Sequence, residues 1–143
     1  MKNLGIILFD IDGVIRDVGN SYRLAVQQTV DYFCQWEPTQ RDIDNLKNEG
    51  IWNNDWDLSQ ELIKRYINKN KLNINPPLRP EIINLFEKLY FGYKSSEKNK
   101  NWTGFIRNEE LLVGKEFFEN LNNNGIKWGF VSGAERESAK FVL

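Results

Sequence analysis

The stretch GIILFDIDGVIRD, residues 5–17, places two aspartates directly after an apolar run. That run, LGIILF at residues 4–9, predicts a strand buried on both faces, as in a parallel sheet covered by helices. Residues two apart on an extended chain point the same way, so Asp10 and Asp12 can face one cavity. Crowded carboxylates are costly without a counter-charge. Either the two acids lie at an exposed strand end, or they hold something positive.

The composition narrows the possible chemistry. The chain has 143 residues, no histidine and a single cysteine, Cys34. These counts exclude histidine-dependent triads, histidine-ligated zinc and an intrachain disulfide, and they leave carboxylates, hydroxyls, lysine and arginine, with a hard metal bound through oxygen. A net charge of −1 gives no reason to expect nucleic acid or an anionic membrane as a partner. Because residues 4–9 are too short for a membrane span or a signal peptide, we expect a soluble, cytoplasmic protein.

Apolar periodicity and capping residues predict several helices after the first strand. The first is capped by Asn20 or Ser21, and in the third Glu61 is spaced to pair with Arg65. The expected helices are residues 20–33, 39–50, 55–70, 81–92 and 115–125.

The end of the chain predicts a second strand and one more helix. IKWGFV, residues 126–131, reads as the strand, and a helix starts within the following SGAERESAKFVL. Two apolar strands separated by helices indicate an α/β protein with a parallel sheet. The helical block between them is far longer than a simple crossover, so we expect an inserted helical subdomain. The predicted division is a core of residues 1–19 and 105–143, and a helical cap with its linker at 20–104.

This topology gives the aspartates a chemical context. Ligands of open α/β sheets bind beyond the carboxyl ends of the strands, where Asp10 and Ser132 are expected to lie. Two close carboxylates favour a cation, and Mg²⁺ prefers oxygen ligands and commonly bridges to phosphate. Ser132 and Gly133 open a predicted helix, whose free N–H groups suit an anion. Together these features predict a magnesium and phosphate site, with Gly13 allowing the sharp turn after Asp12.

At these residues the chain resembles the haloacid dehalogenase (HAD) superfamily. DIDGV at 10–14 is similar to its first motif and FVSGA at 130–134 to its second, with a helical cap between them as in subfamily I. GIWNNDWD, residues 50–57, further resembles a little-characterised branch of that subfamily. The resemblance implies a Rossmann-like HAD core with an inserted all-helical cap, and a Mg²⁺-dependent phosphohydrolase acting on a small phosphorylated metabolite.

The resemblance also implies individual roles. Asp10 would be the nucleophile that accepts the phosphoryl group, forming an aspartyl-phosphate intermediate. Asp12 would be the general acid and then the base, and both aspartates would bind the metal. Ser132, with Gly133, would bind the phosphate.

The chain departs from the family's pattern at its C-terminal end. The third motif supplies a lysine and the fourth supplies further acids for the metal, and both come after the second motif. Few residues follow Ser132, and Lys140 comes too soon to be that lysine. Two strands are expected where such a sheet usually has about five or more. We therefore interpret the chain as an incomplete, N-terminal part of a longer hydrolase, expected to be inactive alone.

Other interpretations stay open. A dehalogenase of the same superfamily needs the nucleophile but no acid for the leaving group, so Asp12 favours phosphate. A catalytically silent binding or regulatory module is the alternative from another class. Arg16 could face the phosphate or the surface. Asn53 and Asn54 could contact substrate, or they could form a turn and cap a helix.

Overall fold

The computed structural model describes residues 5–92, 102–134 and 136–143. The chain divides into two compact units, which are described separately. The sheet unit comprises residues 1–19 and 108–143, and the helical unit comprises residues 20–107. Most of the polar loop expected at 93–104 lies outside the described residues, and no helix among those described is long and apolar enough to cross a membrane.

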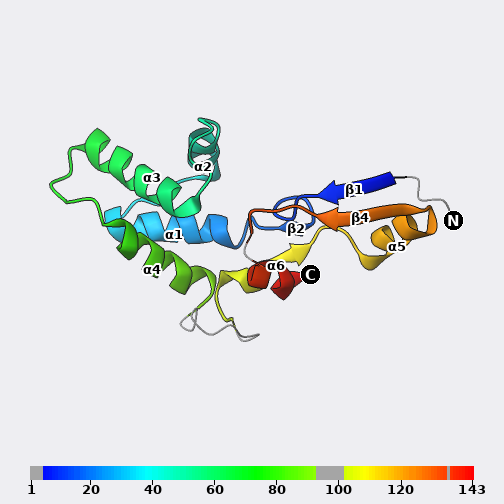
Figure 1. Ribbon diagram of the computed structural model, residues 1–143. Coiled ribbons are helices and arrows are strands. Elements are labelled where there is room, and N and C mark those ends of the chain that lie inside the picture. Colours follow the sequence, from blue (N-terminus) through cyan, green and yellow to red (C-terminus); the bar gives the residue numbers. More distant parts are fainter. Residues whose placement is uncertain (1–4, 93–101, 135) are drawn as a thin grey trace. The chain divides into compact units, whose positions relative to one another are not determined.

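The sheet unit is built on two parallel strands. Strand β1, Gly5–Phe9, pairs with β4, Ile126–Phe130, and the register runs from Gly5 opposite Ile126 to Phe9 opposite Phe130. Figure 1 shows the two arrows side by side and pointing the same way. The parallel pairing predicted from the two apolar runs is confirmed. A short antiparallel pair, β2 (Arg16–Asp17) with β3 (Glu110–Leu111), was not predicted from the sequence.

Aromatic side chains attach one helix to this sheet. Helix α5, Lys115–Asn123, contributes Phe118, whose ring centroid lies 4.4 Å from that of Trp128 and 6.2 Å from that of Phe9. Phe117 meets Phe9 edge to face at 5.7 Å. Such pairs contribute beyond the area they bury. One face of the sheet is therefore covered by α5.

The other face of β1 is open among the described residues, which corrects the prediction of a strand buried on both faces. Because side chains alternate along a strand, Phe9 and Ile7 face α5 while Ile6 and Leu8 point the other way. Ile6 is 70% exposed and Leu8 is 63% exposed. The continuous apolar run does form a strand, but the described part of the chain supplies only one covering helix and one neighbouring strand.

Four helices and a short 3₁₀ segment form the helical unit. Their bounds are α1 (Tyr22–Cys34), α2 (Gln40–Lys47), α3 (Asp55–Asn70), α4 (Arg79–Tyr90) and η1 (Phe105–Asn108, whose last residue belongs to the sheet unit). Helices α1, α3 and α4 pack on one another. All four predicted helices in this region are present, with ends shifted by up to three residues. Ser21 precedes α1 as proposed, but its side chain makes no capping bond.

Small and branched apolar side chains form the core of this unit. The apolar side chains that are fully shielded from solvent are Ala25, Val26, Val30, Ile43, Leu58, Ile63, Ile82 and Ile106. In α3 the buried apolar residues Leu58 and Leu62, and likewise Ile63 and Ile67, are four residues apart, which is the periodicity read from the sequence.

Candidate functional site

Asp10 and Ser132 lie at the same edge of the parallel sheet. Asp10 directly follows β1, and Ser132 comes two residues after β4. Phe9 is opposite Phe130, and the Val131 N–H donates to the Phe9 carbonyl at 2.9 Å, so the segments after β1 and β4 leave the sheet at the same level. The sheet thus brings together two of the residues singled out from the sequence at its carboxyl edge.

The loop after Asp10 is a tight turn held by its own backbone. The Ile11 carbonyl accepts from the N–H groups of Ile15 (2.8 Å) and Arg16 (3.1 Å). Gly13 has φ +74°, a left-handed conformation that favours glycine. Ile11 and Ile15 are both buried and anchor the turn. This turn folds Arg16 back onto Asp12.

The two aspartates have different surroundings. Asp10 is exposed, and its Oδ1 accepts from the Ile11 N–H at 2.8 Å. Asp12 is 25% exposed, and its Oδ1 accepts from Arg16 Nε at 2.6 Å. The counter-charge expected for the two aspartates is supplied, in the case of Asp12, by the guanidinium of Arg16, four residues along the chain.

Arg16 is buried, with 1% of its side chain exposed. Its Nη1 lies 2.9 Å from Glu109 Oε2 and donates to the Ser138 carbonyl at 2.8 Å. Of the two orientations proposed for Arg16, the surface one is wrong. The apolar turn of Ile11 and Ile15 draws residue 16 into the interior, where a buried carboxylate compensates its charge.

Ser132 closes a turn of its own. Its Oγ accepts from the Ala134 N–H at 3.1 Å, and Gly133 between them is exposed. The expected helix is α6, Arg136–Val142, which begins four residues after Ser132. Ser132 is therefore not the residue that caps this helix.

Asn53 and Asn54 belong to the helical unit. Asn54 is the N-cap of α3, and its Oδ1 accepts from the N–H groups of Trp56 (3.0 Å) and Asp57 (3.1 Å). The interpretation as a turn and helix cap is confirmed for Asn54. Asn53 and Asn54 are both exposed, and a substrate contact by either stays a prediction.

Two residues that complete this environment, Glu109 and Ser138, were not predicted from the sequence. Glu109 is an acid in an ordinary polar stretch, and Ser138 contributes only its backbone carbonyl to Arg16. Neither has a local sequence signal, because both are brought to Arg16 by the long-range pairing of β2 with β3 and the packing of α6.

Asp10 and Asp12 differ in how well they could bind a hard cation at this edge. Among residues 5–92, 102–134 and 136–143 there is no group of three or more aspartate, glutamate, histidine or cysteine side chains placed to hold a metal. Asp10 presents an exposed carboxylate, the donor type that Mg²⁺ prefers. Asp12 shares one oxygen with Arg16, so it is a weaker candidate ligand.

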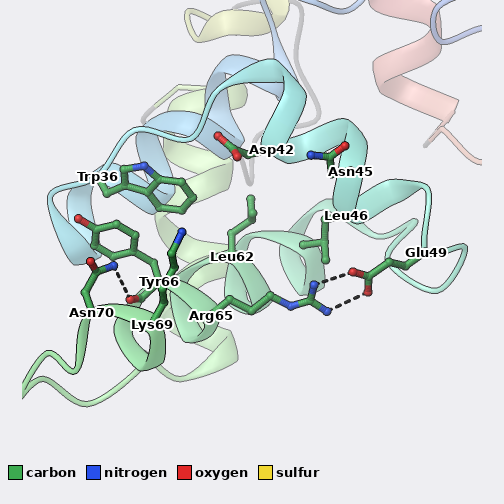
Figure 2. A pocket seen from close by; sticks show the side chains of 10 residues that line it. All are labelled: Trp36, Asp42, Asn45, Leu46, Glu49, Leu62, Arg65, Tyr66, Lys69 and Asn70. Carbon is green, nitrogen blue, oxygen red and sulfur yellow. Dashed lines mark hydrogen bonds and ion pairs between the residues drawn. The ribbon is translucent and has the colours of Figure 1, made fainter.

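A separate pocket of about 300 Å³ lies within the helical unit, between the segment after α1 and helices α2 and α3 (Figure 2). Trp36 and Tyr66 stack there with ring centroids 4.5 Å apart. Arg65 makes two bonds to Glu49, at 2.6 and 2.8 Å. This contact, followed by one from Trp52, lowers the pKa of Glu49 to about 2. Because Arg65 and Glu49 bond to each other, these two charged groups are less available to a ligand than the exposed carboxylate of Asp10 at the sheet edge.

Comparisons with known proteins place the fold. No family model matches the chain. It is 33% identical over 138 residues to a Phytophthora nicotianae protein named imidazoleglycerol-phosphate dehydratase; the match covers 95% of this chain, which spans 28% of the length of that relative. Among solved structures, phosphatase Tt82 from Thermococcus thioreducens is similar, with a TM-score of 0.66, 20% identity, and coverage of 97% of this chain and 68% of that one. The chain thus has a mixed α/β fold like that of a phosphatase.

Proposed function

We propose that the chain carries the nucleophile end of a phosphohydrolase of the HAD type, with a helical cap, acting on a small phosphorylated metabolite. One observation carries the proposal: the carboxylate of Asp10 and the hydroxyl of Ser132 leave adjacent parallel strands at the same edge. An exposed carboxylate at the same edge as hydroxyl and glycine N–H donors can attack a phosphoryl group while those donors hold the phosphoryl oxygens.

Each residue has a proposed role. Asp10 attacks phosphorus, so that a bond forms between Oδ and phosphorus while the bond to the ester oxygen breaks. Asp12, held by Arg16, donates a proton to that leaving oxygen and then takes one from the water that cleaves the aspartyl phosphate. Ser132 and the Gly133 backbone bind the phosphate oxygens.

Asp10 would also hold a magnesium ion, because it is the exposed oxygen donor of the pair. When bound, such an ion would screen the negative charge of the phosphate from the carboxylate that attacks it. We assign this role to Asp10 before Asp12, whose Oδ1 already accepts from a guanidinium.

The comparisons support the substrate class in outline. The solved neighbour is a phosphatase by name, and the curated relative's name refers to a phosphorylated small molecule. The dehydratase activity in that second name belongs to a protein of which this chain matches 28%, and we do not assign it to this chain.

The test uses the protein expressed from the complete reading frame that contains residues 1–143. Hydrolysis of a generic aryl phosphate in Mg²⁺ should be abolished by Asp10→Asn and lowered roughly 10²–10⁴-fold by Asp12→Asn. Asp17→Asn is the matched control, because Asp17 is an exposed aspartate of the neighbouring strand β2, and its Oδ1 accepts from the Gly19 N–H. Full activity in the Asp10→Asn protein would remove Asp10 from the nucleophile role.

The two alternatives are tested in the same preparation. A dehalogenase would release halide from a 2-halo acid, and its ester intermediate would be cleaved at the Asp10 carbonyl carbon, which would place solvent oxygen in Asp10. A phosphatase would place solvent oxygen in inorganic phosphate. A silent binding module would bind a phosphorylated ligand with no turnover in the wild-type protein.

A further inference from the structure

Arg16 contacts three segments of the sheet unit that are distant in sequence. Its Nε bonds Asp12 in the loop after β1, its Nη1 lies 2.9 Å from Glu109 just before β3, and the same nitrogen donates to the Ser138 carbonyl in α6. The arginine side chain is 1% exposed and that of Glu109 is 0% exposed. A planar guanidinium with fixed donors, held at this many points, has little freedom to move.

This arrangement fixes one oxygen of Asp12, the Oδ1 that accepts from Arg16 Nε. The Asp12 side chain is 25% exposed, so it reaches solvent, whereas the Arg16 side chain, at 1%, does not. An acid that transfers a proton needs one oxygen in a constant place, and a displacement of about 1 Å can cost about 10²-fold in rate.

The same guanidinium links the two loops of the proposed site. Asp12 belongs to the loop after β1, while Ser138 lies in the helix that follows the Ser132 turn after β4. Bonds from one arginine therefore join the loop that carries Asp12 to the helix that follows the Ser132 turn.

We propose that Arg16 is a positioning residue, which orients the Asp12 carboxylate for proton transfer and ties it to the Ser132 side of the sheet edge. This inference rests on the proposed function. It gives Arg16 no contact with substrate, because only 1% of its side chain is exposed. The expected signature is a loss in kcat with KM unchanged, transmitted through Asp12.

The test must separate positioning from stability, since Arg16→Met alone breaks the buried ion pair with Glu109. The double variant Arg16→Met with Glu109→Leu removes both buried charges and keeps the interior apolar. Glu109→Gln is the control that keeps Arg16 and its Asp12 bond. Both proteins, made from the complete reading frame, are first shown to be folded by circular dichroism and then assayed with an aryl phosphate.

We expect the double variant to lose about 10²-fold in kcat at unchanged KM, and Glu109→Gln to retain the wild-type kcat. In an Asp12→Asn background, the double variant should change kcat by no more than about twofold, because Arg16 acts through Asp12. In the nitrogen-15 spectrum of the wild type, the Arg16 Nε–H resonance should shift on Asp12→Asn and stay in place on Asp17→Asn.

Each other outcome is decisive. If the folded double variant keeps the wild-type kcat while Asp12→Asn is impaired, the positioning role of Arg16 is overturned and the proposed function stands. An equal kcat loss in Glu109→Gln, or an undiminished effect in the Asp12→Asn background, would show a structural role only. Full activity in both Asp10→Asn and Asp12→Asn would overturn the proposed function and this inference with it.

Discussion

The buried ion pair of Arg16 and Glu109 gives the sharpest prediction about stability. Both side chains are almost completely shielded, with 1% and 0% exposed, and Nη1 lies 2.9 Å from Oε2. Breaking a buried ion pair by removing one partner takes the opposite charge away from the other, which costs about 3–5 kcal/mol. Arg16→Met should therefore lose about that amount of the free energy of unfolding, a large part of the ~5–15 kcal/mol expected for a domain.

Removing both charges should cost much less. Replacing a buried pair by apolar groups of similar volume is often neutral or stabilising, and the Asp12 bond that is also lost joins a partly exposed carboxylate, worth about 0–1 kcal/mol. The double variant Arg16→Met with Glu109→Leu should be more stable than Arg16→Met alone. Glu109→Gln keeps an acceptor for Arg16 and should lose about 1.5–3 kcal/mol.

The assay is urea unfolding followed by tryptophan fluorescence and circular dichroism for the four proteins. Where Arg16→Met is unfolded in water, refolding by a stabilising osmolyte gives its midpoint on the same scale. If Arg16→Met loses less than about 1 kcal/mol, or the double variant is no more stable than Arg16→Met alone, the pair is not the compensated buried contact described here.

Three further predictions concern other parts of the chain. Thr29 is fully shielded and its hydroxyl has no hydrogen-bond partner among the described residues, so Thr29→Val should raise the free energy of unfolding by about 1 kcal/mol in thermal melts, whereas a loss would show that the hydroxyl is bonded. The Glu49 carboxyl, bonded by Arg65 and Trp52, should titrate with a pKa of about 2 by carbon-13 NMR. Because folding lowers this pKa, the small stabilisation that Glu49 provides is present above its ordinary pKa of 4.5 and is lost as the pH falls toward 2. An unchanged Glu49 pKa in Arg65→Met would contradict the assignment of this shift to Arg65. The open apolar face of β1, with Ile6 70% and Leu8 63% exposed, should make residues 1–143 associate in size-exclusion chromatography; Ile6→Thr with Leu8→Lys should reduce association, and a monodisperse wild-type chain would contradict the prediction.

Local patterns in the sequence were enough for the helices and the two main strands. The three- and four-residue spacing in α3 predicted both its buried face and the Glu61–Arg65 pair, which is present at 2.7 Å. The parallel partnership of β1 and β4 followed from two short apolar runs separated by helices. Burial of β1 was predicted wrongly, because periodicity reports which side chains are apolar and not what the rest of the fold supplies to cover them.

The candidate site was predictable where it depends on strand ends and not where it depends on packing. Asp10 and Ser132 were expected at one edge, because the carboxyl ends of parallel strands meet there. The burial of Arg16 needed long-range information: Glu109 comes to it through the β2–β3 pairing, and Ser138 through α6. Arg65 likewise bonds Glu49 across a helix pair, a contact sixteen residues apart that no local spacing predicts.

The central claim is that Asp10 accepts the phosphoryl group, and the most direct measurement is mass spectrometry of the acid-quenched reaction. The protein from the complete reading frame is mixed with excess aryl phosphate and Mg²⁺, quenched in acid and digested, and the peptide that contains Asp10 is sequenced. We expect a phosphoryl group on the Asp10 carboxylate in the wild type, more of it in Asp12→Asn, where hydrolysis is slowed, and none in Asp10→Asn. Turnover with the phosphoryl group on another residue, or a phosphorylated peptide in the Asp10→Asn protein, would contradict the nucleophile role of Asp10.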